Sequence, residues 1–150
     1  MSTQDRIEQQ VVIDAPVARV WKLVTEPGWW IGDGNDRTGQ RRYRDGDLDV
    51  VEDPRFGRFP VRTETTEPQH YVSYRWASTF PGEDLRPDNS TLVEFWLSEH
   101  DGGTLLRVVE SGFASLAVPD EARERSVNGN IEGWVEQLTA IQKRAEQSVE

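Results

Sequence analysis

Glu110 is the polar residue of this 150-residue chain whose position is best suited to chemistry. It belongs to a predicted strand, Thr104 to Gly112, on which it has the same parity as Leu106 and Val108. If those two side chains face the interior, the carboxyl group faces it too, and burial would raise its pKa. Such a group could act as an acid, a base or a hydrogen-bonding anchor.

Two alternatives to this interpretation stay open. Glu110 could be a structural residue, held in an ion pair by an arginine such as Arg62 or Arg75. The other parity of its strand is also partly apolar, so the opposite face could be the buried one (Leu105, Arg107, Val109). We therefore assign no catalytic residue and keep Glu110 as a weak catalytic candidate.

Nucleophilic catalysis has little support elsewhere in the chain. The two histidines, His70 at a strand start and His100 in a hairpin turn, are expected to be exposed. Ser111 lies in Glu-Ser-Gly-Phe, which lacks the leading glycine of a nucleophile elbow. The residues therefore predict neither a catalytic triad nor acyl transfer.

Metal and cofactor motifs are also incomplete. The chain has no cysteine, and Gly32-Asp33-Gly34 lacks the third glycine of a dinucleotide site. The acidic run that begins at Asp45 has Val50 where a calcium loop requires glycine and Phe56 where it requires glutamate. We expect no metal and no cofactor.

Aromatic side chains gather in segments that should face one another. Trp21 and Trp134 lie in apolar helical stripes and are expected to fill the core, whereas Trp29 and Trp30 are adjacent in a glycine-bounded connector. If that connector is extended, at most one of the pair points inward, so a pocket rim is as good an interpretation as core packing. Asn128 and Asn130 could supply amide contacts to a ligand or cap a helix kink. The expected ligand-binding residues are Trp29, Trp30, Tyr74, Trp76, Phe95, Glu110, Phe113, Asn130 and Trp134.

The formal charge of −10 argues against nucleic acid or an anionic membrane surface as the main partner. The basic run Arg41-Arg42-Tyr43-Arg44 is followed by aspartates that cancel its field, which favours a solvated loop. No basic leader or membrane-length apolar run occurs, so we expect a cytoplasmic protein without membrane insertion. The length and even composition fit one domain, residues 1–150.

Hydrophobic periodicity predicts a mixed order of elements. A strand over 6–13 precedes a helix that begins at Pro16 and ends near Thr25, with a brief second helix at Trp29 and Trp30. Extended segments follow at 47–52, 57–65, 70–76, 91–99 and 104–112, and Asp101-Gly102 predicts a hairpin between the last two. A long helix over 120–147 carries Gly129 and Gly133, which predict a bend or break near 128–133. This order is that of an α+β fold.

Three stretches together resemble a known family. They are Ile13-Asp-Ala-Pro with Val20-Trp21, the hairpin from Thr91 to Phe113 with its Glu-Ser-Gly-Phe end, and Asn130 with Gly133-Trp134 and Gln137-Leu138. In this order they resemble the START-like superfamily called SRPBCC, and within it the family related to the activator of the heat-shock protein 90 ATPase. The resemblance runs from about residue 6 to 145.

This resemblance implies a helix-grip fold, in which a curved antiparallel sheet wraps around a long C-terminal helix and two short helices close one end. It also implies a cavity between sheet and helix that binds an apolar or aromatic small molecule or a lipid. Two alternatives remain: a polyketide cyclase or dehydratase-like enzyme with Glu110 as acid or base, and a co-chaperone-type interaction module. Chaperone binding is doubtful, because 150 residues leave no room for a separate chaperone-binding domain. A homodimer is a further expectation.

Overall fold

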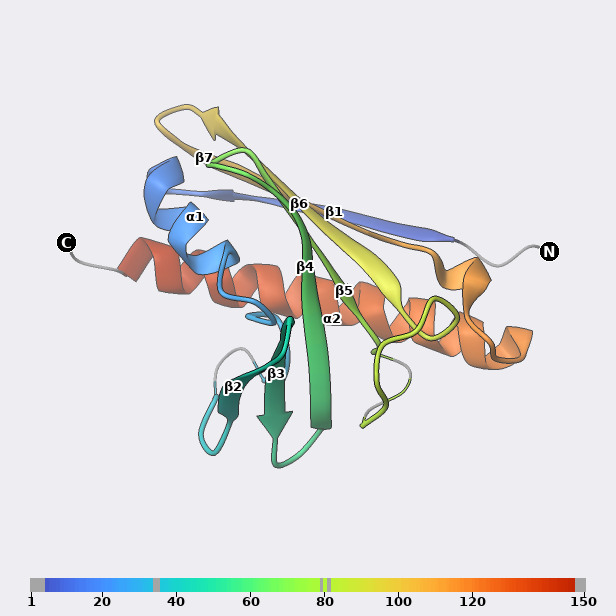
Figure 1. Cartoon of the computed structure of the whole chain (residues 1–150). Helices are drawn as coiled ribbons and strands as arrows, with labels where there is room; N and C mark the ends of the chain where they lie inside the picture. Colours follow the sequence, from blue (N-terminus) through green and yellow to red (C-terminus); the bar gives the residue numbers. More distant parts are fainter. Residues whose placement is uncertain (1–4, 34–35, 79, 81, 148–150) are drawn as a thin grey trace.

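A curved antiparallel sheet and a long helix make up most of the structure (Figure 1). The computed structural model describes residues 5–33, 36–78, 80 and 82–147. In this part of the chain, seven strands lie in the order β1-β7-β6-β5-β4-β3-β2, and each pair of neighbours is antiparallel. Their bounds are β1 Arg6–Ile13, β2 Arg41–Asp45, β3 Leu48–Asp53, β4 Gly57–Glu67, β5 Tyr71–Trp76, β6 Thr91–His100 and β7 Gly103–Ser111.

The helices are α1 (Val17–Val24), a 3-10 turn η1 (Phe113–Ser115) and α2 (Asp120–Gln147). Figure 1 shows α2 lying along one face of the sheet, with α1 beside its C-terminal half. The apolar core lies between this face and α2, and it draws on strands and helices alike. The predicted helix-grip, α+β fold is confirmed.

The first and last strands of the chain are neighbours. β1 pairs with β7 along its whole length, so that Ile7 stands opposite Glu110 and Ile13 opposite Thr104. Ile7 and Ile13 are buried while Arg6 and Glu8 are exposed, which confirms the alternation read from the sequence. Antiparallel pairing of the two ends places the recognisable segments of the sequence against each other.

The β6–β7 hairpin also follows its sequence signal. Its two central residues, Asp101 and Gly102, have φ values of 49° and 82°. A two-residue turn with both central residues left-handed matches the right-handed twist of the strands it joins, and Asp-Gly is among the pairs that adopt it most readily. The turn therefore sets the register that runs from the tip to Glu110.

α2 is continuous from Asp120 to Gln147, so a break near 128–133, one of the two predicted alternatives, does not occur. Gly129 and Gly133 both lie within it, and a Cβ added at either would meet nothing within 4 Å. Packing of the buried side chains of α2 against the sheet outweighs the weak helix propensity of glycine.

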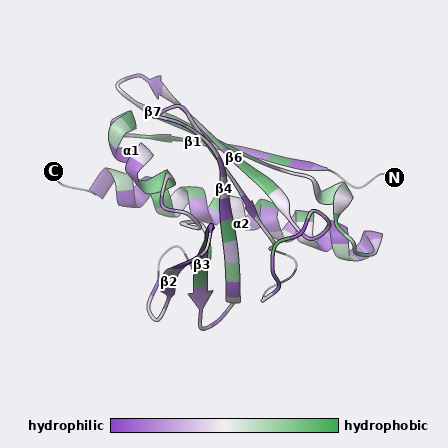
Figure 2. Ribbon diagram, viewed as in Figure 1, coloured by the Kyte–Doolittle hydropathy of each residue, from purple (hydrophilic) through white to green (hydrophobic). Residues whose placement is uncertain are grey.

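Figure 2 shows hydrophobic and hydrophilic residues alternating along α2. No helix of the described residues is both apolar enough and long enough to cross a membrane.

The basic run expected to be a solvated loop is the strand β2, so that expectation is wrong. Pairing with β3 supplies the backbone hydrogen bonds of β2. The side chain of Arg42 also joins β2 to the segment that follows α1. Its guanidinium donates to the carbonyl oxygens of Pro27 at 3.0 Å and Gly28 at 3.2 Å. β2 thereby fixes the connector that carries Trp29 and Trp30.

That connector is a series of tight turns rather than the brief second helix expected. The amide of Trp29 donates to Glu26 and that of Ile31 to Gly28, and Gly28 has a φ of 72°. A Cβ on Gly28 would lie 2.7 Å from a methyl group of Val51, so glycine is needed here on both counts. Gly34, expected to end the segment, lies outside the described residues.

Two glycines offer a matched test of this packing. A Cβ at Gly103 would lie 2.4 Å from the backbone oxygen of Ile13, which cannot move without disturbing the β1–β7 pairing. We expect Gly103→Ala to lower the free energy of unfolding by about 1–3 kcal/mol, and Gly129→Ala, in open space, to raise it by about 0.5–1 kcal/mol. Urea denaturation of the two variants measures both, and a break in the helix at Gly129 would remove the gain.

Candidate functional site

Glu110 faces the core from β7. Leu106, Val108 and Glu110 are all fully buried on the same face of the strand, which confirms the parity on which its inward orientation depends. β7 lies between β1 and β6, so neighbouring strands cover Glu110 on both sides within the sheet. Helix α2 covers the inner side of Glu110 with the side chains of Asn130 and Trp134.

Four neutral donors hold the carboxylate. Oε2 accepts hydrogen bonds from Thr91 Oγ1 at 2.5 Å and from Trp76 Nε1 at 2.9 Å. Oε1 accepts from Asn130 Nδ2 and Trp134 Nε1, both at 2.9 Å. Both oxygens are therefore satisfied by groups that carry no charge.

The register of the sheet and the pitch of the helix bring these donors together. Trp76 of β5 pairs with Thr91 of β6. Thr91 lies two positions before Val93, the residue of β6 that pairs with Glu110 of β7. Asn130 and Trp134 are four residues apart in α2, so their side chains lie on one face of the helix. Three strands and a helix thus meet at a single carboxyl group.

Burial raises the pKa of the Glu110 carboxyl above its usual range. The hydrogen bonds from Thr91, Trp134, Trp76 and Asn130 act in the opposite direction, since they stabilise the charged form. The hydroxyl of Thr91 can also accept a hydrogen bond, whereas the indole and amide groups of the other three only donate here. Thr91 is therefore the partner toward which a protonated Glu110 would point its hydrogen.

The ion pair considered from the sequence does not form. Arg62 Nε lies 2.9 Å from Glu64 and Arg75 Nε lies 3.7 Å from the same side chain. Arg75 stands between the inward-facing Tyr74 and Trp76 on β5, so it points to the opposite face of the sheet. The expectation of an arginine partner is wrong because strand alternation separates the two groups.

A cavity of about 260 Å³ opens next to the Glu110 network, between the sheet and α2. Aromatic rings from the connector, β4, β5 and α2 make up much of its wall, which also includes amide, hydroxyl, carboxylate and aliphatic side chains. The lining residues are Trp30, Ile31, Gly32, Phe56, Phe59, Trp76, Ser78, Asn130, Gly133, Trp134, Glu136 and Gln137. Three of them, Trp76, Asn130 and Trp134, are the donors that bind Glu110.

Trp29 and Trp30 are both buried, although at most one was expected to point inward. The turns of the connector rotate successive side chains to the same side, which an extended backbone cannot do. Trp30 packs against Tyr74, Trp76 and Trp134 with ring centroids 5.2, 5.6 and 5.8 Å away. Trp29 packs against Phe95 at 5.3 Å.

The residues expected to bind a ligand therefore divide into two groups. Trp30, Trp76, Asn130 and Trp134 line the cavity. The others are buried in the protein and are not part of the cavity wall: Trp29, Tyr74, Phe95, Glu110 and Phe113. Asn128, the other amide considered, is exposed on α2.

Sequence reasoning missed the opposite wall and the rim. Phe56 and Phe59 come from the turn before β4 and from β4 itself. The sequence predicted the strand at 57–65 but gave no sign that it faces the cavity. Gln137 lies seven residues beyond Asn130 on α2, so helical spacing could have found it. Its Nε2 donates to the Gly32 oxygen at 2.7 Å and fixes the rim.

Two buried polar atoms of lining residues have no hydrogen-bond partner among the described residues. They are Trp30 Nε1, a donor, and Gln137 Oε1, an acceptor. A buried polar group without a partner is costly, and native structures rarely leave one unpaired. The cavity wall therefore has one hydrogen-bond donor and one acceptor that a ligand could pair.

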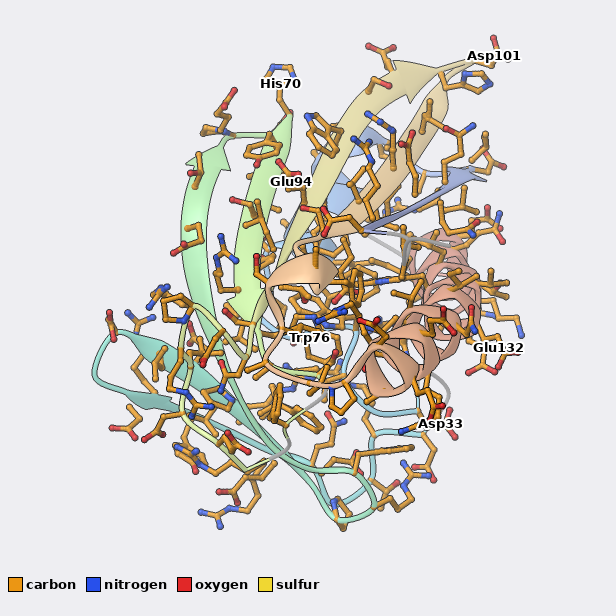
Figure 3. All side chains as sticks on the ribbon, turned by 90° about the vertical axis from the view of Figure 1, so that its right-hand side faces the viewer. Asp33, His70, Trp76, Glu94, Asp101 and Glu132 are labelled. Carbon is orange, nitrogen blue, oxygen red and sulfur yellow. The ribbon has the colours of Figure 1, made fainter. Side chains whose placement is uncertain are left out.

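Other chemistry is distant from this site. Figure 3 shows Trp76 among the side chains between sheet and α2, whereas His70 and Asp101 lie at the far tips of their hairpins. His70 and His100 are both exposed, as expected. In the described part of the chain, no cluster of three or more histidine or acidic side chains could hold a metal ion.

Solved structures share this fold at low sequence identity. The Mesorhizobium loti protein MLL2253 superimposes with a TM-score of 0.70 at 17% identity, over 97% of this chain and 99% of that one. A dimeric Aha1 from Colwellia psychrerythraea gives a TM-score of 0.68 at 14% identity, over 96% and 98%.

DynU16, described as a putative protein in the dynemicin biosynthetic locus, gives a TM-score of 0.65 at 21% identity. The match covers 96% of this chain but 48% of DynU16. A search of curated proteins found no match. At these identities the likeness shows the fold alone.

The sequence pattern of one family matches residues 14–146, from the end of β1 almost to the end of α2. This range includes the helix α1, both strands of the hairpin and the donors on α2 that bind Glu110. The chain therefore belongs to the family described as activator of Hsp90 ATPase homolog 1-like proteins.

Proposed function

We propose that this protein binds a small aromatic molecule in the cavity between its sheet and α2. The observation that carries the proposal is that one buried carboxylate, Glu110, fixes three side chains of the cavity wall, those of Trp76, Asn130 and Trp134. A wall whose side chains are held before a ligand arrives loses little conformational entropy on binding. Glu110 serves as an anchor for that wall.

The size of the cavity narrows the ligand class. Its volume of about 260 Å³ lies just below the range of roughly 300–1,000 Å³ typical of small-molecule sites. A compact ligand of one or two rings suits this space better than a long acyl chain or an extended polyketide. The indole and phenyl rings of Trp76, Trp134 and Phe59 would stack on such rings.

The polar atoms of the wall suggest a hydroxylated ring. A phenolic hydroxyl can donate to Gln137 Oε1 and accept from Trp30 Nε1, the two atoms that lack partners among the described residues. Both atoms are covered by neighbouring side chains, so this pairing requires a small rotation of the wall. We expect a hydroxyl to strengthen binding by satisfying them.

Catalysis by Glu110 has less support than binding. Its raised pKa would suit an acid or base, but the side chain is fully buried and does not belong to the cavity wall. Both oxygens already accept two hydrogen bonds each. A ligand in the cavity would meet Trp76, Asn130 and Trp134 before it met the carboxyl group.

A chaperone-directed role has no comparable support in the described residues. The large hydrophobic side chains that are exposed there, Val12, Tyr43, Phe56 and Val135, come from four separate segments. Arg41 lies over the ring of Tyr43 and Arg55 over that of Phe56, so neither ring presents a bare apolar surface. The family name alone does not assign such a role.

Ligand binding can be tested with a matched pair of glycine variants. Gly133 lines the cavity and Gly129, one turn away on the same helix, does not. We expect 2-naphthol to quench tryptophan fluorescence of the natural protein with a dissociation constant at or below roughly 100 μM. Gly133→Leu, which fills the cavity, should weaken this binding at least about tenfold, and Gly129→Leu should leave it unchanged.

The choice of probe tests the ligand class as well. Naphthalene, which lacks the hydroxyl, should bind more weakly than 2-naphthol, and palmitate should bind more weakly than either. Tighter binding of palmitate would overturn the compact-ligand proposal. Equal effects of the two leucine variants would place the binding elsewhere.

The anchoring role of Glu110 predicts a distinctive pH dependence of stability. Because folding raises its pKa, the native state binds more protons than the unfolded state between the ordinary value of 4.5 and the folded value. The contribution of Glu110 to the free energy of unfolding is therefore largest below pH 4.5 and is lost as the pH rises through the folded pKa. Glu110→Gln should lack this dependence.

The variant also changes the hydrogen bonds in a known way. The glutamine oxygen can accept from Asn130 and Trp134 and its nitrogen can donate to Thr91, but Trp76 Nε1 loses its acceptor. At pH 4.5 we expect the variant to be less stable by about 1–3 kcal/mol, with a gap that narrows as the pH rises. Urea denaturation from pH 4 to 8 measures it, with the exposed Glu99→Gln as control; a constant gap would contradict the raised pKa.

A further inference from the structure

The outer face of the sheet carries a second cavity, separate from the aromatic one. It has a volume of about 540 Å³, and β4, β5, the loop before β6 and the turn after β7 surround it. Arg62 and Arg75 form its floor, on the face of the sheet opposite Glu110. The sequence allowed either arginine to form an ion pair with Glu110, but neither does so in the structure.

Arg62 and Arg75 stand directly opposite each other on neighbouring strands. Like charges in this position repel, and a sheet normally avoids them. Glu64 is shared between them, with Arg62 Nε at 2.9 Å and Arg75 Nε at 3.7 Å. Both contacts use the Nε nitrogens, and within the described residues the terminal Nη nitrogens of the two guanidinium groups make no hydrogen bond or ion pair. Both arginines line the cavity.

A third arginine closes the cavity from the loop. Arg86 is bound by Glu83 at 3.0 Å and by Asp88 at 3.2 Å, two carboxylates outside the cavity wall that together outweigh its charge. The cavity wall itself has three arginines and one glutamate, in a chain whose formal charge is −10. The excess of positive charge therefore comes from the strand pair.

The loop that carries Arg86 is rigidly built. The buried side chain of Asn89 accepts from the Arg86 amide at 2.7 Å and donates to the Asp84 oxygen at 2.8 Å. The buried Ser90 hydroxyl donates to the Arg86 oxygen at 2.7 Å. These bonds fix the wall of the cavity without using the side-chain donors of Arg62 or Arg75.

We propose that this cavity binds a small organic molecule through an oxyanion, either a carboxylate or a phosphate group, held between Arg62 and Arg75. A guanidinium presents donors in a planar fork that matches the oxygens of either group. Glu64 balances one of the two guanidinium charges, and an anion between the arginines would balance the other. Leu85 and Pro87 supply an apolar wall for the organic part of the ligand.

Titrations with inorganic pyrophosphate and with citrate test the proposal and distinguish phosphate from carboxylate. NMR spectra of ¹⁵N-labelled full-length protein, recorded on the arginine Nε–Hε signals, should show saturable shifts at Arg62 and Arg75 with at least one of the two probes. Arg75→Gln should weaken that binding about tenfold, because it removes a charge-assisted hydrogen bond.

Arg44→Gln is the matched control, since it removes the same charge from the exposed strand β2, far from this cavity in the sheet order. It should leave the affinity within about twofold, apart from the weak screened effect of net charge. Equal losses in Arg44→Gln and Arg75→Gln, or the absence of shifts at Arg62 and Arg75 with both probes at 10 mM (roughly 3 kcal/mol of binding free energy or less), would overturn the proposal. Gly133→Leu should not change this binding, so the result is independent of the aromatic cavity.

Discussion

A carboxylate with neutral partners only is the interaction on which the interior of this protein depends. Removing a charge from water is costly, and an interior of low polarity compensates for it only when hydrogen bonds replace the lost solvent. Glu110 receives four such bonds, from β5, β6 and α2. Each donor must hold its position for the carboxyl group to be satisfied, so the sheet, the helix and the cavity wall are fixed together.

The aromatic cluster complements this polar centre. Trp30 contacts Tyr74, Trp76, Phe95 and Trp134 at centroid distances between 5.2 and 5.8 Å, in tilted and edge-to-face arrangements. Such contacts bury a large apolar area but allow more than one arrangement of the rings. Hydrogen bonds from two of the indole groups to one carboxylate select a single arrangement. The same hydrogen bonds fix Trp76, Asn130 and Trp134, three side chains in the wall of the cavity beside them.

The two faces of the sheet offer different chemistry because strand alternation divides the side chains between them. Tyr74 and Trp76 turn to the aromatic interior, and Arg75 between them turns to the outer cavity. An apolar pocket and a basic pocket are thus separated by one layer of backbone.

The sequence by itself determined the elements whose signals are local: the alternation of Arg6–Ile13, the Asp101-Gly102 turn and the long helix α2. It left open which face of its strand Glu110 occupies, and the tertiary structure decided that by burying the carboxyl group. Only the tertiary structure decided the partners of Glu110, the burial of both Trp29 and Trp30, the strand at Arg41–Asp45 and the unbroken helix at Gly129. Those features depend on contacts between residues far apart in the chain. Thr91, Trp76, Asn130 and Trp134 meet only after strand register and helix packing are set, and no spacing in the sequence encodes that meeting.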